Sequence, residues 1–492
     1  MLSALDKITI AWIAIPFLLG FIVYLLPRFA RWFAFAISII SLSYAIAIFW
    51  LNSTLNIQLL DNFGVSLTVD SLSAWFVLTN ALVTMAVILY CWQTGKTAFF
   101  YMQLVILHGS VNATFICTDF ISLYVALEVI SIAAFLLIAY PRSDRSIWVG
   151  LRYLFMSNTA MLFYLIGTVL VYQANNSFNY SGLLNAPVEA IALVILGLLG
   201  KGGIFVSGFW LPLTHSESET PVSAMLSGVV VKAGVFPLVR LALMLEAINP
   251  IVRLFGVATA LLGVIFAIWE QDTKRTLAFS TISQLGFILA APVVSGFYAL
   301  THGLAKSALF LVAGQLPSRR FAELRQLKVK NQIGIALLIP CLSISGFPLV
   351  SGFVAKTLTM DSLLSWQRVW MIAVTVGTAI VFAKFIFVID FTSIFTASTA
   401  KHLNSTFWWA MLILQGGLVA ANGFYVQAYT FSNLIKPLAT IAIGWVIYLF
   451  VIKKILIKLP RANERFEHLI GVMSLTLILL FWTVWTRIQF SA

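Results

Sequence analysis

Residues 199–240 read LGKGGIFVSGFWLPLTHSESETPVSAMLSGVVVKAGVFPLVR, and this stretch decides the fold. It contains two apolar segments long enough to be membrane helices, and each carries a lysine near its middle, Lys201 in the first and Lys232 in the second. A lysine at bilayer depth costs about 2.5–3.5 kcal/mol on insertion scales. Two such lysines so close together are expected to serve a function, and other residues of the chain indicate which function that is.

The composition of the chain is that of a polytopic membrane protein. Of its 492 residues, 61% are hydrophobic and 10% are charged, whereas about 25% of the residues of a soluble protein are charged. The formal net charge of +13 does not indicate nucleic-acid binding, because the basic residues fall in short loops between apolar runs, as the positive-inside rule expects. The three cysteines have neither metal-ligand nor disulfide spacing. We therefore expect no metal, no cofactor and no nucleic-acid partner.

Sixteen apolar runs have the length of a membrane span, about 17–25 residues. They cover residues 8–26, 32–50, 72–92, 98–116, 119–140, 146–173, 189–211, 222–244, 248–269, 273–294, 296–315, 333–358, 370–395, 406–424, 436–457 and 466–486. The first run lacks a cleavage site and is interpreted as a spanning helix, not as a signal peptide. Basic residues gather in alternate loops, with Arg240 to Arg253 as the clearest exception. This pattern favours sixteen spans with both termini outside.

Two segments between the apolar runs have patterns of their own. Residues 56–69 alternate between apolar and polar and contain turn residues, which predicts a short external hairpin or loop. Residues 317–330 are basic and amphipathic, which predicts an interfacial helix on the cytoplasmic side.

Ionisable residues inside the predicted spans mark ion or proton pathways by default. An isolated carboxylate at mid-membrane would protonate, so we expect Glu128 to pair with a lysine of a neighbouring helix, with Lys201 as the candidate. Lys384 and Asp390 lie near a helix end, where snorkelling explains them as well as a place in the pathway does. His108 is better interpreted as a structural histidine. The central residues of the pathway are Glu128, Lys201, Lys232, His302, Lys306 and Lys356.

Such a row of groups can carry protons. Burial favours the neutral amine of a lysine and a nearby carboxylate favours its charged form, so moving the carboxylate switches the amine between releasing and holding a proton. Lysines and histidines linked by water would then form a relay. The chain has no nucleophile–base arrangement, no glycine-rich phosphate loop after a strand and no cofactor motif.

Two of the predicted helices that carry a lysine are interrupted. Lys201 is followed by a Gly-Phe-Trp-Leu-Pro run that ends at Pro212, and Lys356 is preceded by a Gly-Phe-Pro run that ends at Pro348. Such helices in corresponding places of two halves point to an inverted-repeat transporter. We expect N-terminal helices in residues 1–97, one five-helix repeat in 98–245, its inverted copy in 246–396, and further helices in 397–492.

Several motifs occur in order between about residues 70 and 400: LYVALEVISI, GKGGIFVSGFWLPLTH, TPVSAMLSGVVVKAGVFPLVR, DTKRTLAFSTISQLGFI, ALTHGLAKSALFLVAGQL and SGFPLVSGFVAKTL. In these motifs the chain resembles the antiporter-like membrane subunits shared by Mrp-type multisubunit Na⁺/H⁺ antiporters and respiratory complex I. The resemblance implies an all-α fold with about 14 core transmembrane helices, of which helices 7 and 12 are broken, so the last two predicted spans are an extension.

The resemblance also implies a role for each matching residue. Glu128 would pair with Lys201, and Lys232 would be the connecting lysine of the eighth helix. His302 and Lys306 would continue the polar axis, and Lys356 would be the terminal lysine, opening to the opposite side of the membrane; these roles define the relay Glu128, Lys201, Lys232, His302, Lys306 and Lys356.

A lysine at position 356 and the chain length resemble the D-type subunit of Mrp antiporters, whereas one complex I subunit has a glutamate at the matching place. The chain departs from the family at Leu213-Thr214, where an aspartate is usual, and at Glu217 and Glu219. These two carboxylates fit either a solvated loop or a channel mouth that gathers cations.

We therefore expect a proton-translocating subunit of a multisubunit Na⁺/H⁺ antiporter in the inner or plasma membrane, working with other membrane subunits. The alternative is a proton-pumping membrane subunit of a complex I-like NAD(P)H or ferredoxin:quinone oxidoreductase. A non-conducting scaffold is a third interpretation, against which the row of buried charges argues.

Overall fold

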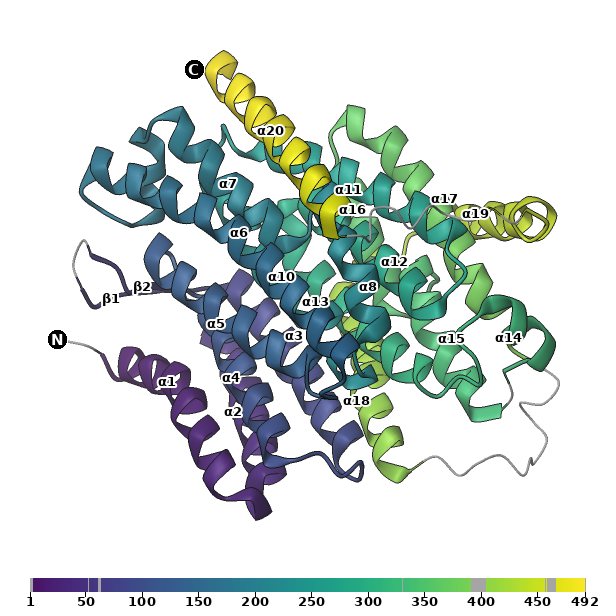
Figure 1. The fold of residues 1–492 in the computed structure, drawn as a ribbon. Helices are drawn as coiled ribbons and strands as arrows, with labels where there is room; N and C mark the ends of the chain where they lie inside the picture. The colour runs from purple at the N-terminus through teal and green to yellow at the C-terminus, as the bar shows by residue number, and fades with distance from the viewer. Residues whose placement is uncertain are drawn as a thin grey trace.

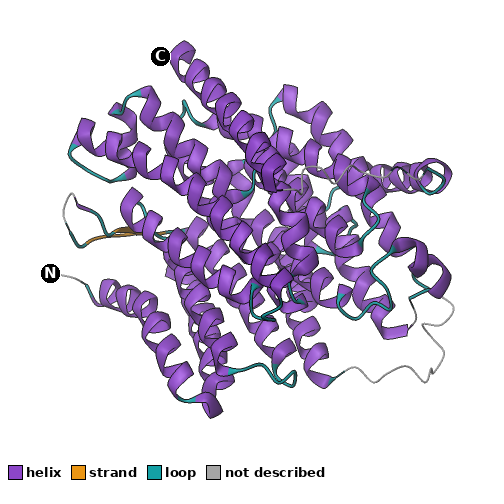
Figure 2. Ribbon diagram, in the orientation of Figure 1, coloured by secondary structure: helices purple, strands orange, loops and turns teal. Residues whose placement is uncertain are grey.

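The computed structural model describes residues 3–51, 53–60, 63–329, 331–390, 404–455, 457 and 466–491, and these are almost entirely helical (Figure 2). In chain order the helices are α1 (Ala4–Leu25), α2 (Ala30–Leu51), α3 (Ser71–Cys91), α4 (Ala98–Thr114), α5 (Phe120–Ile138), α6 (Asp144–Asn175), α7 (Val188–Gly202), α8 (Trp210–Glu217), α9 (Thr220–Met225), α10 (Val231–Met244), α11 (Asn249–Trp269), α12 (Thr273–Ala290), α13 (Ser295–Ala313), α14 (Phe321–Leu327), α15 (Asn331–Ser345), α16 (Ser351–Asp361), α17 (Ser365–Ile386), α18 (Ser405–Asn422), α19 (Phe431–Ile447) and α20 (Phe466–Ser491). Every one of the sixteen predicted spans coincides with a helix or with a pair of consecutive helices.

The number of full-length spans is smaller than the sequence predicts. By length and composition, eleven helices of the described chain could cross a membrane, or twelve if the bent pair α12–α13 counts as one span. The other predicted spans are α4, with 17 residues, the interrupted pair α15–α16, and α20. The pair α12–α13 is bent by 107°, and α12 begins with Thr273, Lys274 and Arg275. An apolar run that has a polar first turn or a helix break therefore does not form a straight membrane-spanning helix.

The hairpin predicted for residues 56–69 is present. Strand β1 (Leu55–Gln58) pairs antiparallel with β2 (Ser66–Val69), with Leu55 opposite Val69; residues 61 and 62, between the strands, lie outside the described residues. The segment predicted as an interfacial helix contains the helix α14, which is shorter than predicted and buries Phe321 and Leu324; its place at the membrane surface stays a prediction. Several basic residues used for the topology lie outside the described residues, namely Lys330, Lys401, Lys458, Arg461 and Arg465.

The helices that carry the predicted site lie at the centre of the molecule. Every residue of α12 and of α13 is buried, and the apolar window of 220–244 is 100% buried. The corresponding windows of α1, α2 and α19 are 28%, 33% and 17% buried, and Figure 1 shows α1 and α19 at the margins with α10 and α13 in the middle. Protein therefore surrounds the charges on α10 and α13, and their surroundings are not lipid.

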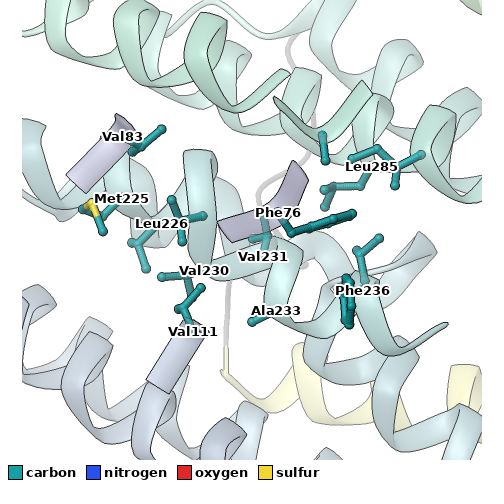
Figure 3. Close-up of a cluster of buried hydrophobic side chains, with 14 of the residues drawn as sticks. Phe76, Val83, Val111, Met225, Leu226, Val230, Val231, Ala233, Phe236 and Leu285 are labelled. Carbon is teal, nitrogen blue, oxygen red and sulfur yellow. The ribbon is translucent and has the colours of Figure 1, made fainter. Parts of the chain in front are cut away.

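Apolar contacts fix α9 and α10 in this central place. Figure 3 shows side chains from α3, α4 and α12 closing around them, including Phe76, Val111 and Leu285, with Met225, Val230 and Phe236 facing outward from the central helices. The ring centroids of Phe76 and Phe236 are 4.9 Å apart in an edge-on contact. Lipid is as apolar as these side chains, so van der Waals packing of the cluster, and not transfer from water, favours this central place for α10.

A close approach of two helices brings the lysines of the opening stretch together. Gly234 of α10 faces Gly202 of α7, and a Cβ added to Gly234 would lie 2.5 Å from the Gly202 Cα. Small residues at such a crossing let membrane helices pack backbone to backbone. The helices of Lys201 and Lys232 are thereby locked against each other, and α20 packs on the outer side of α7.

Candidate functional site

Lys201 is held by three oxygen atoms. It lies at the end of α7, just before Gly203, whose φ of +65° ends the helix. Its Nζ donates to the Leu127 carbonyl oxygen over 2.9 Å and to Ser157 Oγ over 2.6 Å, and also to Ser131 Oγ. The side chain is 7% exposed. Uncharged oxygen atoms of α5 and α6 therefore accept hydrogen bonds from all three ammonium hydrogens.

The predicted contact between Glu128 and Lys201 is not formed. The ammonium group binds the carbonyl of Leu127, the residue before Glu128, and two hydroxyls satisfy its other hydrogens. Within the described residues, Glu128 Oε1 is buried and has no hydrogen-bond partner. The other oxygen, Oε2, accepts from the Asn158 amide over 3.3 Å when the amide nitrogen is turned toward it. The Glu128 carboxylate therefore lies near Lys201 but makes no hydrogen bond to its ammonium group.

Lys232 is fully buried beside an irregular turn. A π-helical turn at Leu226–Val230 joins α9 to α10, and such a turn leaves carbonyl groups outside the regular ladder. Lys232 Nζ donates to two of them, Gly228 O at 2.5 Å and Ser227 O at 3.3 Å. A Cβ on Gly303 of α13 would lie only 3.5 Å from this nitrogen. The π-turn was not predicted, because the pair Ser227-Gly228 inside it also occurs in regular membrane helices.

His302 and Lys306 lie one turn apart on α13, as predicted. Lys306 Nζ donates to the Leu277 carbonyl oxygen of α12 over 3.0 Å and lies 5.2 Å from the centroid of the Phe382 ring, a cation–π contact. Neither ring nitrogen of His302 has a partner among the described residues, although the side chain is 2% exposed. Buried polar atoms of this kind are the places that ordered water fills.

Two hydroxyl groups connect the surroundings of Lys232 and Lys306. Ser227 Oγ and Thr281 Oγ1 are 2.7 Å apart, and Thr281 Oγ1 also donates to the Leu277 carbonyl oxygen over 2.9 Å. Sequence reasoning missed this pair. Buried serine and threonine are common in helices, and the spacing of these two does not show that they meet.

Lys356 occupies the second interrupted helix. The chain breaks between Ser345, the last residue of α15, and Ser351, the first of α16, with Gly346 at φ +87°. Lys356 Nζ donates to the freed Ser345 carbonyl oxygen over 3.4 Å and lies 5.5 Å from the Phe287 ring centroid.

Both predicted helix breaks are therefore present, but the two prolines differ in place. Pro348 lies within its break, between α15 and α16. Pro212 is the third residue of α8 and follows the break after α7.

Lys384 is a helix cap in this structure. Its Nζ donates to the Ala267 and Ile268 carbonyl oxygens over 3.1 and 3.2 Å and also to Glu270 O, the last carbonyls of α11. A cation at a helix C-terminus is favoured by the helix dipole. At 1% exposure the side chain does not snorkel. Asp390 is half-buried after α17, and its backbone N–H donates to Val329 O over 2.8 Å.

His108 is structural, as the sequence indicates. Its Nδ1 lies 3.0 Å from Thr84 Oγ1 and its Nε2 lies 2.8 Å from Ser41 Oγ, so both ring nitrogens have partners. A different histidine, His215 of α8, resembles His302. It is fully buried, stacks on Phe310 at a centroid distance of 4.6 Å, and has no partner for either ring nitrogen among the described residues. Its place in the opening stretch was the only signal for it.

The two unusual carboxylates at the end of α8 are paired. Lys96 Nζ lies 2.7 Å from Glu219 Oε2, and an Arg145 guanidinium nitrogen lies 3.6 Å from Glu217 Oε1. A site that gathers cations needs carboxylates whose charge is not already neutralised, so these ion pairs favour a structural role for both residues.

The other end of α10 carries a buried ion pair. Arg240 binds Asp70 through Nη1 at 2.5 Å and Nη2 at 3.1 Å, and Nη2 also donates to Ser73 Oγ over 2.8 Å. Burial by itself raises the pKa of Asp70, but the two bonds from Arg240 and those from Ser73 outweigh it, so the pKa lies below its ordinary value. The pair connects Asp70, the residue just before α3, with the last turns of α10.

Comparison with known proteins gives a consistent family. The sequence profile described as "NADH:quinone oxidoreductase/Mrp antiporter, TM" matches residues 117–382, slightly more than half of the chain. Hydrogenase-4 component B of Escherichia coli is 29% identical over 448 residues, which cover 77% of this chain and 66% of that protein. NADH-quinone oxidoreductase subunit N of Desulforudis audaxviator is 29% identical over 363 residues, covering 66% and 72%. A putative antiporter subunit of Staphylococcus aureus is 29% identical over 394 residues, covering 70% of this chain and 48% of that one.

Two solved structures share the fold. A chain of the membrane-bound sulfane sulfur reductase, an archaeal respiratory membrane complex, superposes with a TM-score of 0.75 at 19% identity, over 89% of this chain and 98% of that one. A chain of the Mrp complex from Dietzia sp. DQ12-45-1b superposes with a TM-score of 0.71 at 20% identity, over 92% and 99%. With the apolar helices and the transmembrane profile, these matches identify an integral, multi-pass membrane protein.

Proposed function

The chain belongs to the NADH:quinone oxidoreductase/Mrp antiporter transmembrane family, and we propose that it is the proton-translocating subunit of a multisubunit Na⁺/H⁺ antiporter. Its partners would be the other membrane subunits of that assembly, and the energy for moving the cation would come from the proton gradient. The proposed relay consists of Glu128, Lys201, Lys232, His302, Lys306 and Lys356.

The observation that carries this proposal is how the four lysines are held. Every one of their ammonium groups is buried and is bonded to carbonyl or hydroxyl oxygens. None of these bonds, within the described residues, is to a carboxylate. A buried ammonium without a counter-charge is poorly stabilised relative to the neutral amine. Such a site suits a proton that has to leave again. Lys384 also binds carbonyl oxygens, but these lie at one helix end, where the helix dipole favours the charged lysine.

The order of the groups supports a path. Lys201 and Lys356 sit at the two helix breaks, and Lys232, His302 and Lys306 are buried on the central helices α10 and α13. Glu128 lies near Lys201 without a hydrogen bond to it. A small movement of the Glu128 side chain would therefore change the electrostatic potential at the lysine ammonium group. The ring nitrogens of His302, which have no hydrogen-bond partner among the described residues, support a step in the middle of the path in which the proton passes through water.

We propose that residues 98–245 and 246–396 are the two inverted repeats of this path. One interrupted helix in each range, with one lysine at each break, supports that division.

A complex I-like pump is the second candidate. It is favoured by the relatives named as a hydrogenase-4 component and a subunit of NADH-quinone oxidoreductase. In that assembly the same relay would move protons, but a redox module in other subunits would supply the energy. The subunits that copurify with the chain separate the two candidates.

The test is transport in everted membrane vesicles of an antiporter-deficient host that carries the whole gene cluster. Cation-dependent dissipation of a pH gradient would be compared for wild type, Lys201→Ala and Glu128→Ala. We expect both variants to lose the activity with the assembly intact. The matched control is Lys436→Ala, which removes an exposed lysine of the peripheral helix α19 and should leave transport unchanged.

Either of two results would reject the proposal. Full activity in Lys201→Ala and Glu128→Ala would show that protons do not move along the proposed relay. Proton pumping driven by NADH or ferredoxin, with no response to a cation, would assign the chain to the second candidate.

A further inference from the structure

Two hydroxyl groups lie between two lysines of the row. Hydrogen bonds run from Lys306 through the Leu277 carbonyl and Thr281 to the Ser227 hydroxyl, and Lys232 binds the backbone carbonyl of the same Ser227. Ser227 lies in the π-turn before α10, and Thr281 lies one helical turn after Leu277 on α12. Both side chains are fully buried, and their oxygen atoms are 2.7 Å apart. The carbonyl of Ser227 accepts from Lys232, and the carbonyl of Leu277 accepts from Lys306.

The bond pattern gives this connection a direction. Thr281 Oγ1 donates its hydrogen to the Leu277 carbonyl oxygen over 2.9 Å. The hydrogen between the two hydroxyls therefore comes from Ser227. The Leu277 carbonyl oxygen is shared, since it accepts from the Thr281 hydroxyl and from the Lys306 ammonium at 3.0 Å.

We propose that the hydroxyl pair of Ser227 and Thr281 positions Lys232 and Lys306, so that the charge state of one lysine is felt at the other. This inference rests on the proposed function. In one orientation Ser227 donates to Thr281, and Thr281 shares the Leu277 carbonyl with Lys306. In the reversed orientation Thr281 donates to Ser227 and leaves that carbonyl to the ammonium alone. Only hydrogen bonds rearrange, and no proton leaves either hydroxyl.

The packing around the pair makes a two-state arrangement of this kind effective. A Cβ on Gly228, the residue after Ser227, would lie 2.2 Å from Ser307 Oγ of α13, and Ser307 Oγ itself donates to Ala224 O over 3.1 Å. The turn that carries Ser227 is therefore packed closely against α13. Reorientation of the hydroxyl hydrogens needs no movement of this backbone.

An ordinary buried threonine does not have this arrangement. Thr378 of α17 is 2% exposed and donates over 2.8 Å to Val374, four residues earlier in its own helix. Thr281 makes the same bond within its helix and adds one to another helix. Thr378→Val is therefore the matched control for Thr281→Val, because it removes the same group and the same local bond at a site outside the row.

The experiment measures transport in everted vesicles across a range of pH values. We expect Thr281→Val to lower the maximal rate by about tenfold, which is within the range of coupling between contacting residues. Its pH profile should move to more alkaline values, since the Leu277 carbonyl then serves only the Lys306 ammonium and proton release needs a higher pH. Thr281→Ser, which keeps the hydroxyl, and Thr378→Val should both behave as wild type.

The double variant Ser227→Ala/Thr281→Val tests whether the two residues act as a unit. If they do, its loss should equal that of Thr281→Val alone, whereas independent roles would multiply the two losses. Multiplied losses, an unmoved pH profile in Thr281→Val, or an equal loss in Thr378→Val would overturn the inference. The amount of assembled complex, measured for each variant, separates transport from folding.

The result also separates this inference from the function on which it rests. If Lys232→Ala and Lys306→Ala lose transport while Thr281→Val keeps the full rate, the relay stands and the hydroxyl bridge is rejected. If wild-type vesicles show no cation-dependent change in pH, the proposed function fails and this inference fails with it.

Discussion

The lysines of the row and Lys384 show that burial alone does not define a functional charge. Each of these ammonium groups is buried and bonded to oxygen atoms. Lys384, however, binds three carbonyl oxygens at one helix end, where the helix dipole adds to the hydrogen bonds. Lys356 has a single, long bond to a carbonyl at 3.4 Å. We therefore expect a structural role for Lys384 and proton exchange at Lys356.

We expect Lys384→Met to destabilise the protein and to leave the pH profile of transport unmoved. The change removes the donor for the last carbonyls of α11 and leaves them buried without partners, at a cost of about 1–3 kcal/mol for an unsatisfied group. Thermal unfolding of the purified complex would measure the first effect, and vesicle transport the second. A variant of wild-type stability that transports nothing would instead place Lys384 in the relay.

The ion pair of Asp70 and Arg240 predicts a pH dependence of stability. The pKa of Asp70 is lowered in the folded state, so the pair stabilises the fold at pH values above the unfolded pKa of about 3.9. That contribution disappears as the pH falls through the lower, folded pKa. Asp70→Asn should therefore melt earlier than wild type at neutral pH, by the equivalent of about 1–3 kcal/mol.

The difference in melting temperature between the two proteins should shrink once the pH falls below about 4. Melting of the detergent-solubilised complex from pH 7 to pH 3 measures it. A difference that stays constant to the lowest pH would show that the carboxylate charge is not what stabilises this contact.

At this scale the sequence identifies the charges but not their partners. A lysine in an apolar run is visible from the sequence, and all six residues of the predicted relay lie in helices. Whether Lys201 meets Glu128 or the carbonyl of Leu127 depends on the rotation of α5 by a fraction of a turn, which hydrophobic patterning does not fix. The pairing of Ser227 with Thr281 depends on the same kind of detail.

Three of the four lysines of the row lie beside a helix interruption, whereas Lys306 lies on the unbroken α13. The break after α7, the π-turn before α10 and the break between α15 and α16 each free carbonyl oxygens from the helical ladder, and Lys232 and Lys356 bind such oxygens. The two breaks could be predicted, because glycine and proline mark them. The π-turn was not predicted, because its one sequence signal, the pair Ser227-Gly228 in Leu226–Val230, also occurs in regular membrane helices.

Packing of α7 against α10 predicts the effect of a single methyl group. In Gly234→Ala the new Cβ would lie 2.5 Å from the Gly202 Cα and the Gly202 nitrogen, so backbone would have to move. Overpacking of this kind costs about 1–3 kcal/mol. We expect lower thermal stability and reduced transport, since the two helices carry Lys201 and Lys232.

Gly416→Ala is the control for that substitution, because nothing lies within 4 Å of the added Cβ. It should match wild type in both measurements. Equal behaviour of the two alanine variants would show that α7 and α10 are not in the close contact described above.

The whole molecule is graded from a buried centre to an exposed margin. The helices 220–244, α12 and α13 are enclosed by protein, while α1, α2 and α19 present apolar side chains such as Trp50 and Phe431 at 86% and 80% exposure. Composition predicts the membrane class, and the order of apolar runs predicts the helices. Pro292, which follows Ala291, marks the break between α12 and α13. The sequence does not give the 107° bend between them, and so it does not establish whether they cross separately.

The side of the membrane on which the two ends lie decides that question. Sixteen separate crossings put residues 3 and 489 on the same, outer side, whereas counting α12–α13 as one span makes the number odd and puts them on opposite sides. The three native cysteines are buried, so single cysteines introduced as Ser3→Cys and Gln489→Cys can be labelled in intact cells with a maleimide that does not cross the membrane. We expect both to react from outside, and Asp144→Cys, in a predicted cytoplasmic loop, to react only after the cells are opened. Reaction of one terminal cysteine alone would show an odd number of crossings, as expected if the bent pair, or another predicted span such as α4 or α20, does not cross separately.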